Sequence, residues 1–156
     1  LVTESSAAEL GGEYSTLLCP QALGIPDRPT VDAILEFDDT FITADEADLI
    51  EDGISTLTGN AEVTRNTQQV RADVIVYDEP NDTADLDGNV NYWDETTYLN
   101  SNDAFLTFDN GVGEFKNADY ILVESRGRGT AEKMVLDVGT RTDMEQMEYT
   151  TCDPGD

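Results

Sequence analysis

The sequence repeats itself at an interval of about 28 residues. The stretch Gly59-Asn60-Ala61-Glu62-Val63 is echoed by Gly88-Asn89-Val90-Asn91-Tyr92, and Ile42-Thr43-Ala44-Asp45 is echoed by Val70-Arg71-Ala72-Asp73. Apolar and polar residues alternate through each copy, which is the pattern of a β-strand with one buried face. A repeat of this length corresponds to a hairpin-sized unit that stacks on copies of itself. The sequence therefore predicts a β-roll or β-solenoid rather than a globule with a catalytic cleft.

Alternation with a period of two continues from about residue 36 towards the end of the chain. Turn sequences separate the runs, for example Glu51-Asp52-Gly53, Arg65-Asn66-Thr67 and Asp109-Asn110-Gly111. We expect an all-β fold with about ten or more antiparallel strands and no helix. The predicted divisions are an irregular, proline-broken arm over residues 1–35, a roll over residues 36–149 and a linker over residues 150–156.

The alternating rows predict which side chains point into the roll. The predicted inward residues are Ile42, Leu57, Ala61, Val63, Val70, Ala72, Val74, Val76, Leu86, Val90, Tyr92, Leu106 and Phe108. Asn60, Asp73 and Asn89 are expected to point outward. Gly59, Gly88 and the alanines of the inward rows either leave an apolar trough or fit the narrow end of a tapered roll. Trp93, next to inward Tyr92, faces solvent or a partner, or packs at an edge.

Charge excludes one class of function. Thirty-four Asp and Glu residues against eight Lys and Arg give a net charge of −26, whereas nucleic-acid binding requires a basic surface. The acids are spread along the chain, which favours a solvated surface adapted to salt over a dedicated cation store. The sequence has no His, so the commonest general base and metal ligand are missing. No segment approaches 18 apolar residues, the length of a membrane-spanning helix. We predict no catalytic residue, metal or cofactor.

One segment resembles a calcium-binding loop. Thr83-x-Asp85-x-Asp87-Gly88 approximates the D-x-D-x-D-G pattern, but Thr occupies the first position and Asp94 takes the place of the bidentate Glu. The same residues alternate as a strand, which favours a strand over a loop that curls around an ion.

The two cysteines are Cys19 and Cys152. Their separation excludes a CxxC metal or redox motif, and their pairing cannot be read from the sequence. An internal disulfide and bonds to chain beyond this sequence both stay open.

Three stretches together resemble the OstA-like β-jellyroll domains of the lipopolysaccharide (LPS) transport system. The first is Leu57 to Val63 followed by Val70 to Asp73. The second, Arg126-Gly127-Arg128-Gly129-Thr130-Ala131, and the third, Thr151-Cys152-Asp153-Pro154-Gly155, are similar to the member of the system that continues into an outer-membrane barrel. The resemblance implies a V-shaped, twisted roll, open along one side, at the periplasmic face of the outer membrane of a Gram-negative bacterium.

The resemblance also implies what the roll binds. The inward rows would hold LPS acyl chains and pass them to the barrel. An edge that includes Thr40, Ile42, Ala44 and Asp45 would dock the periplasmic LPS bridge protein by edge-to-edge strand addition. Further implied partners are the barrel itself, to which Cys19 and Cys152 would each be bonded, and the plug lipoprotein of the translocon. The alternatives are the soluble bridge protein itself, a calcium-dependent adhesion or surface roll, and a polysaccharide-active enzyme on a β-helix.

Overall fold

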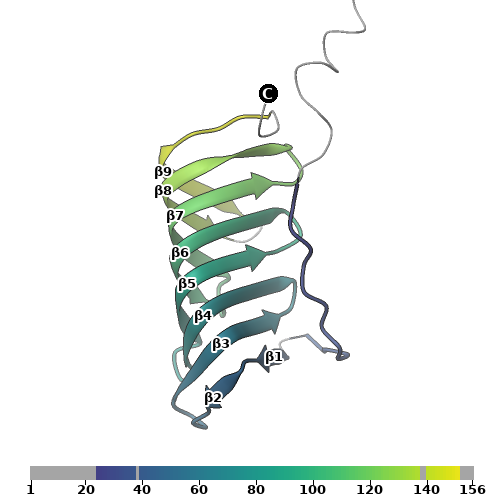
Figure 1. Ribbon diagram of the computed structural model, residues 1–156, viewed down its shortest axis with the longest axis vertical. Coiled ribbons are helices and arrows are strands. Elements are labelled where there is room, and N and C mark those ends of the chain that lie inside the picture. The colour runs from purple at the N-terminus through teal and green to yellow at the C-terminus, as the bar shows by residue number, and fades with distance from the viewer. Residues whose placement is uncertain (1–23, 38, 138–139, 152–156) are drawn as a thin grey trace, which may run out of the picture.

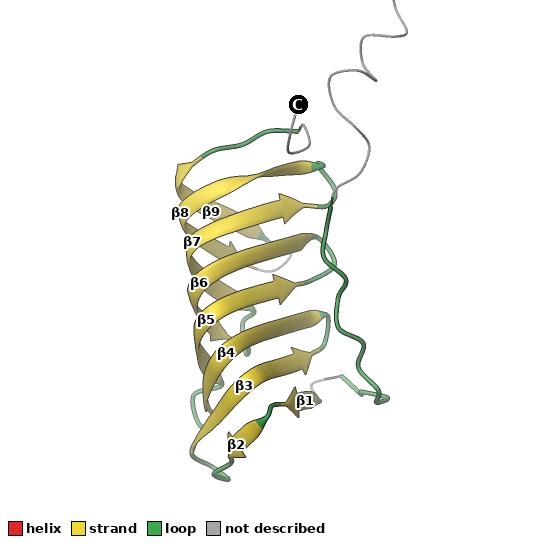
Figure 2. Ribbon diagram, viewed as in Figure 1, coloured by secondary structure: helices red, strands yellow, loops and turns green. Residues whose placement is uncertain are grey.

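The structure is a computed structural model that describes residues 24–37, 39–137 and 140–151. Among these residues there are nine antiparallel strands and no helix, hence none that could cross a membrane. The strands are β1 (Thr40–Thr43), β2 (Glu46–Asp48), β3 (Ile54–Arg65), β4 (Gln68–Asp78), β5 (Thr83–Trp93), β6 (Thr97–Thr107), β7 (Val112–Leu122), β8 (Gly127–Asp137) and β9 (Arg141–Met147). The predicted all-β class is confirmed (Figure 2).

All nine strands belong to one open sheet. Its order is β1-β3-β4-β5-β6-β7-β8-β9, and β2 also pairs with β3 beyond the end of β1. From β3 onward each strand pairs with the next one in the sequence, so the sheet is a succession of hairpins (Figure 1). The segment 40–48 therefore forms one edge and β9 forms the other.

A line of irregularities crosses the middle of the sheet. The pairing register shifts between Thr58 and Ala61 in β3 and between Asp87 and Val90 in β5. Further along the sheet, buried positions are three residues apart instead of two, as at Phe115 and Ala118 in β7. Irregularities of this kind bend a strand and increase its twist. Figure 1 shows the result, because each long strand turns at the left side of the view and continues behind itself.

The bend divides the sheet into two limbs. Limb A contains residues 54–58, 74–78, 83–87, 103–107, 112–116 and 133–137, and limb B contains residues 61–65, 68–72, 90–93, 97–101, 118–122 and 127–131. The strand tips of the two limbs face each other across the open side of a V. The predicted V-shaped roll is therefore confirmed.

The first bend is held by a side chain from the connection between β1 and β2. Gly59 and Asn60 both have positive φ angles, of 75° and 44°. The Asn60 amide nitrogen donates to Asp45 Oδ2 at 2.9 Å, and a Cβ on Gly59 would lie 2.5 Å from the same oxygen. Only glycine leaves room for the Asp45 carboxylate there, and glycine adopts a positive φ without strain.

The second bend repeats the first one in detail. Gly88 and Asn89 have φ angles of 77° and 48°, the Asn89 amide donates to Asp73 Oδ2 at 2.7 Å, and a Cβ on Gly88 would lie 2.5 Å from that oxygen. The internal repeat of the sequence is thus the repeat of this bend. The glycines mark bends and do not line a trough, and Asn60, Asp73 and Asn89 are exposed as predicted.

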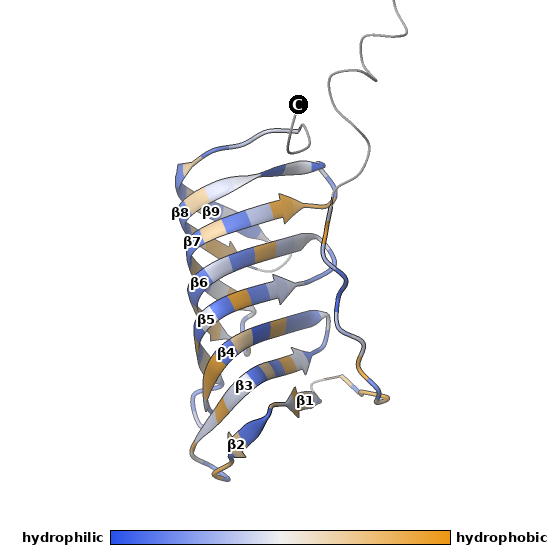
Figure 3. Cartoon of the chain, viewed as in Figure 1, coloured by the Kyte–Doolittle hydropathy of each residue, from blue (hydrophilic) through white to orange (hydrophobic). Residues whose placement is uncertain are grey.

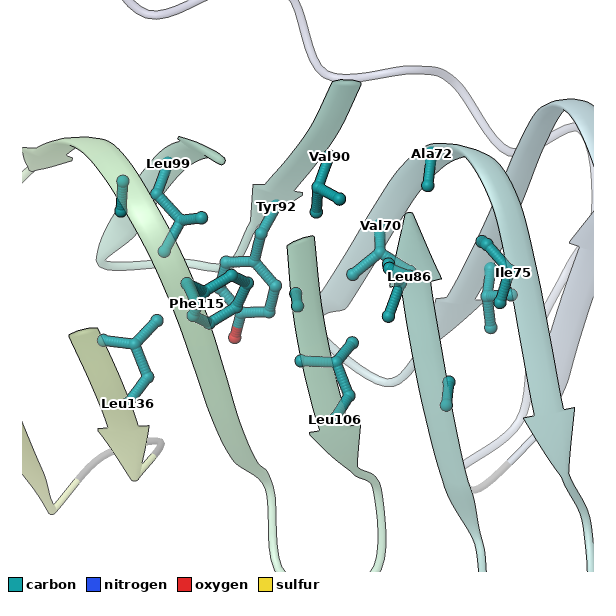
Figure 4. Packing of buried hydrophobic residues seen from close by; sticks show 14 of the residues in the cluster. Val70, Ala72, Ile75, Leu86, Val90, Tyr92, Leu99, Leu106, Phe115 and Leu136 are labelled. Carbon is teal, nitrogen blue, oxygen red and sulfur yellow. The ribbon is translucent and has the colours of Figure 1, made fainter. Parts of the chain in front are cut away.

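The core lies between the limbs. A single sheet has no second layer, so full burial of one face requires the two limbs to pack on each other. Tyr92 of limb B contacts Phe115 of limb A edge to face, with ring centroids 5.3 Å apart (Figure 4). The hydropathy colours alternate along the strands in agreement with one buried face (Figure 3). The buried cluster is Leu57, Ala61, Val63, Val70, Ala72, Ile75, Ala84, Leu86, Val90, Tyr92, Leu99, Ala104, Leu106, Phe115, Ala118, Tyr120, Ala131, Met134 and Leu136.

Two predicted inward residues were assigned to the wrong face. Val74 and Val76 lie on the outer face of limb A, where Val74 pairs with exposed Asp87. The buried residue between them is Ile75, which is 0% exposed. The cause is the bend opposite the second Gly-Asn pair, which changes the phase of β4 and exchanges its faces from that point onward.

The described part of the arm, residues 24–37, has no helix or strand and runs along the strand tips of limb B (Figure 1). Trp93 Nε1 donates to the Pro26 carbonyl oxygen at 3.3 Å, and Arg28 Nε donates to Gln69 Oε1 at 2.9 Å. Trp93 is consequently 5% exposed. Of the alternatives for Trp93, packing is the one that the structure supports, with the arm as its cover.

Candidate functional site: the N-terminal mouth between the limbs

Most predicted groove residues are in the packed interior. Those exposed by 2% or less are Leu57, Ala61, Val63, Val70, Ala72, Leu86, Val90, Tyr92 and Leu106. Ile42 and Phe108 are partly buried and pack against this cluster. Because the limbs already fill the space between them with their own side chains, a ligand can enter only where the packing is open or where the limbs separate.

The packing is open at the N-terminal end of the V. A cavity of about 430 Å³ is lined there by Thr40, Ile42, Leu49, Ile50, Glu51, Ser55, Tyr77 and Glu79. Ile42 comes from β1, which pairs with limb B, whereas Ser55 and Tyr77 come from limb A. The cavity therefore lies between the limbs, and its volume falls in the range of small-molecule sites. We call it the N-terminal mouth.

Apolar side chains surround the N-terminal mouth. Leu49 and Ile50, which line it, are 64% and 49% exposed. Exposed large apolar residues beside a cavity, on a chain with a net charge of −26, are typical of an interaction surface.

A polar link joins the limbs beside the mouth. Arg65, at the tip of limb B, donates through Nη1 to Asp82 Oδ1 and Oδ2 at 2.6 and 2.8 Å. Asp82 lies in the turn at the tip of limb A. The Arg65 and Asp82 side chains are only 17% and 24% exposed. We call this pair the tip bridge.

Two aromatic rings support the tip bridge. Tyr77 donates its hydroxyl to Asp82 Oδ1 at 3.0 Å. Burial, followed by the hydrogen bond to Asp82 and its charge, raises the pKa of Tyr77 to about 12. Phe108 lies edge-on to Tyr77 with centroids 6.0 Å apart, and the Arg65 guanidinium lies 6.0 Å from the Phe108 centroid. Sequence reasoning missed Arg65, Asp82 and Tyr77, since only tertiary structure brings the two turns together.

The C-terminal end of the V is closed by the chain itself. Thr150 and Arg128 exchange backbone hydrogen bonds of 2.8 and 2.9 Å, and Tyr120 donates its hydroxyl to the Glu148 carbonyl oxygen at 2.8 Å. A Cβ on Gly129 would lie 1.7 Å from that same carbonyl oxygen. The glycines of the Arg126 to Ala131 stretch thus make room for residues 148–150.

The predicted docking residues lie at the sheet edge. Thr40 and Ile42 are in β1, and Ala44 and Asp45 join β1 to β2. Both short strands pair only with β3 among the described strands, which leaves their outer side open. Cys19 and Cys152 lie outside the described residues, so their pairing stays a prediction.

Comparison with known proteins identifies the family. A family model described as LptA/(LptD N-terminal domain) LPS transport protein matches residues 41–153. The LPS-assembly protein LptD of Nitrosococcus oceani is 33% identical over 115 residues, which cover 74% of this chain and 16% of that protein. The LptD of Methylococcus capsulatus is 33% identical over 102 residues, which cover 65% and 10%. The chain therefore spans less than a fifth of the length of these relatives.

A solved structure shows the same fold. LptH of Pseudomonas aeruginosa, the LptA homologous periplasmic component of a conserved lipopolysaccharide transport device, superposes with a TM-score of 0.59. The match covers 72% of this chain and 94% of LptH at 14% sequence identity. The family model covers well over half of the sequence, and the fold agrees with it. This chain belongs to the LptA/LptD N-terminal domain family of LPS transport proteins.

Proposed function

We propose that this chain is the periplasmic domain of an LptD-type protein and carries LPS with the acyl chains held between limbs A and B. The observation that carries the proposal is the N-terminal mouth, an apolar-rimmed cavity of about 430 Å³ between the limbs. Membership in a transport family supports this function over the calcium-dependent adhesion roll and the polysaccharide enzyme.

The packed interior suits a carrier. Burial of apolar surface contributes about 25 cal/mol per Å², so a few hundred Å² of acyl chain would contribute several kcal/mol. Part of this gain is offset because the contacts between the limbs, such as Tyr92 with Phe115, must be given up first. The net affinity is therefore modest, which allows the lipid to be passed on.

Each proposed partner is assigned to one end of the chain's sheet. The open edge of β1 and β2 would pair with a strand of the periplasmic bridge protein. Asp45, Glu46 and Asp48 on this edge are exposed charges that discourage pairing with unrelated strands. In this proposal residues 36–149 form the transport domain, and residues 150–156 lead to the outer-membrane barrel with its plug lipoprotein. Cys19 and Cys152 would bond to that barrel.

Site-specific photo-crosslinking tests the proposal. A photo-reactive amino acid at Ile42 or Ser55, which line the mouth, is expected to capture LPS. Their immediate neighbours Thr43 and Thr56 point to the other face and serve as matched controls. Capture that is equal at all four positions, or absent at Ile42 and Ser55, contradicts acyl-chain binding between the limbs.

A further inference from the structure

The tip bridge spans the route that a lipid must take. Arg65 and Asp82 belong to turns at the tips of opposite limbs, so their contact closes the open side of the V next to the N-terminal mouth. An acyl chain that passes from the mouth into the interior must part the limbs at this point. The tip bridge is therefore an obstacle to entry unless the ligand itself loosens it.

Tyr77 connects the cavity to the tip bridge. Its side chain lines the N-terminal mouth, and its hydroxyl donates to Asp82. An apolar chain in the mouth would lie against the Tyr77 ring, and displacement of that ring would remove one of the hydrogen bonds that hold Asp82. The apolar part of a ligand thus weakens the carboxylate side of the bridge.

Arg65 provides a positive charge that can pair with the phosphate of a lipid headgroup. A guanidinium binds a carboxylate and a phosphate in the same bidentate geometry. Arg28 lies at the same turn, where its Nη2 donates to the Thr67 carbonyl oxygen at 2.7 Å. Two of the eight cationic residues of a chain with 34 acidic ones, Arg28 and Arg65, thus lie at one turn, and Arg65 pairs in the sheet with Thr40, which lines the mouth.

We propose that Arg65 is a phosphate-binding residue and that the phosphate of an entering lipid replaces Asp82 as its partner, which opens the V. The ligand is a phosphorylated amphiphile, since tail and phosphate each act on one side of the tip bridge. This inference rests on the proposed function, because it takes the lipid that the limbs would carry as its ligand.

The test compares two lipids that differ only in phosphate. The 156-residue chain with the photo-reactive amino acid at Ile42 is exposed to bis-phosphorylated lipid A or to the dephosphorylated form. We expect about tenfold better capture of the phosphorylated lipid, the effect of one charge-assisted contact. Arg65→Gln removes this preference but still captures the dephosphorylated lipid. Arg65→Lys, which keeps the charge without the bidentate geometry, gives an intermediate preference.

Arg71→Gln is the matched control. Arg71 is paired with Glu62 on the outer face of limb B, away from the open side. The preference for phosphate should survive this change, and Asp82→Asn should raise the capture of both lipids because the bridge is already loose. A preference that persists in Arg65→Gln, or that Arg71→Gln abolishes equally, overturns the inference. Failure of every variant and of the parent chain to capture any lipid overturns the proposed function instead.

Opening of the V is measured separately. Spin labels at Thr67 and Asn81, in the turns at the two tips, report the distance across the open side. We expect this distance to increase with bis-phosphorylated lipid A and to stay unchanged with inorganic phosphate, which has no tail to displace Tyr77. An increase with inorganic phosphate alone would mean a simple anion site, and no increase with either ligand would mean that the tip bridge does not gate entry. Either result overturns the inference.

Discussion

The two ends of the interior are built from the same sheet, but a cavity lies at the N-terminal end and residues 148–150 cover the C-terminal end. At the N-terminal end, Ile42 and Tyr77 line a cavity, and large apolar residues are exposed around it. At the C-terminal end, Tyr120 is 1% exposed, and residues 148–150 lie directly on Gly127 and Gly129. The N-terminal end therefore has a cavity with exposed apolar side chains, whereas the C-terminal end has residues 148–150 bonded to β8. In the proposed function a lipid would enter at the N-terminal mouth, and residues 148–150 would keep their bonds to β8.

The largest expected effect tests how tightly the C-terminal end is packed. Tyr120→Ala should lower the free energy of unfolding by about 3–4 kcal/mol, because a fully buried aromatic ring and its hydrogen bond to Glu148 are lost. Tyr77→Ala should cost about half as much, since its ring borders a cavity. Urea unfolding measures both values. Equal losses would mean that the two ends do not differ in packing.

A glycine at the C-terminal end gives the next effect. Gly129→Ala places a methyl group where the Glu148 carbonyl oxygen lies, so residues 148–150 must move away from β8. We expect a loss of about 2 kcal/mol, typical of overpacking. Hydrogen exchange at the Thr150 amide, which bonds to the Arg128 carbonyl, should become faster. Unchanged exchange at the Thr150 amide would refute the conclusion that residues 148–150 need a glycine at position 129.

The same Gly-Asn bend occurs beside the sheet edge, at Gly59, and in the interior of the sheet, at Gly88, so the two positions can be compared directly. Gly88→Ala should cost about 1–2 kcal/mol, because the new side chain is held at a φ of 77° against Asp73. Gly59→Ala should cost less, since Asp45 belongs to the edge segment and can shift away. Thermal unfolding of both variants provides the measurement. A larger loss for Gly59→Ala would show that the edge is as rigid as the centre.

The smallest effect is a pH dependence at the N-terminal mouth. The pKa of Tyr77 rises from 10.0 to about 12 in the folded chain, so the unfolded chain loses this proton first as the pH increases. The stability that Tyr77 contributes is complete below pH 10 and is lost as the pH rises towards about 12. Tyr77→Phe should therefore make the decline in unfolding free energy between pH 10 and 12 shallower. An unchanged slope would exclude Tyr77 as a contributor.

Local pattern was enough to predict the class of fold. Each strand from β3 to β8 has one buried face, so alternation reveals it, and residues such as Asn66 and Asn110 mark the turns. The error at Val74 and Val76 has a local cause. In β3 and β5 the bend is visible as Gly-Asn, but in β4 the phase changes beside Asp73, where the sequence has no glycine. The prediction for β4 therefore used a uniform period of two through Asp73, although the inward and outward faces of the strand exchange there.

The candidate site was less accessible to sequence reasoning. Ile42 was predicted to point inward because it belongs to an alternating row, and it lines the N-terminal mouth. Arg65 and Asp82 are 17 positions apart in two separate turns, and nothing local distinguishes their charges from those of other turns. Their contact depends on how far the sheet bends, which is a property of the whole fold. The same holds for the arm over Trp93.

The bend motif has a consequence for length. Each Gly-Asn bend takes its Asp from the segment that pairs with it on the N-terminal side, so one repeat of about 28 residues contains all that it needs to continue the sheet. One more repeat would add two strands, each about 4.8 Å from the last. The roll would then grow by about 10 Å while its cross-section stayed the same. A protein that has to bridge a gap between two membranes could thus be fitted to that gap by duplication of whole repeats, with no change to the cross-section through which its cargo passes.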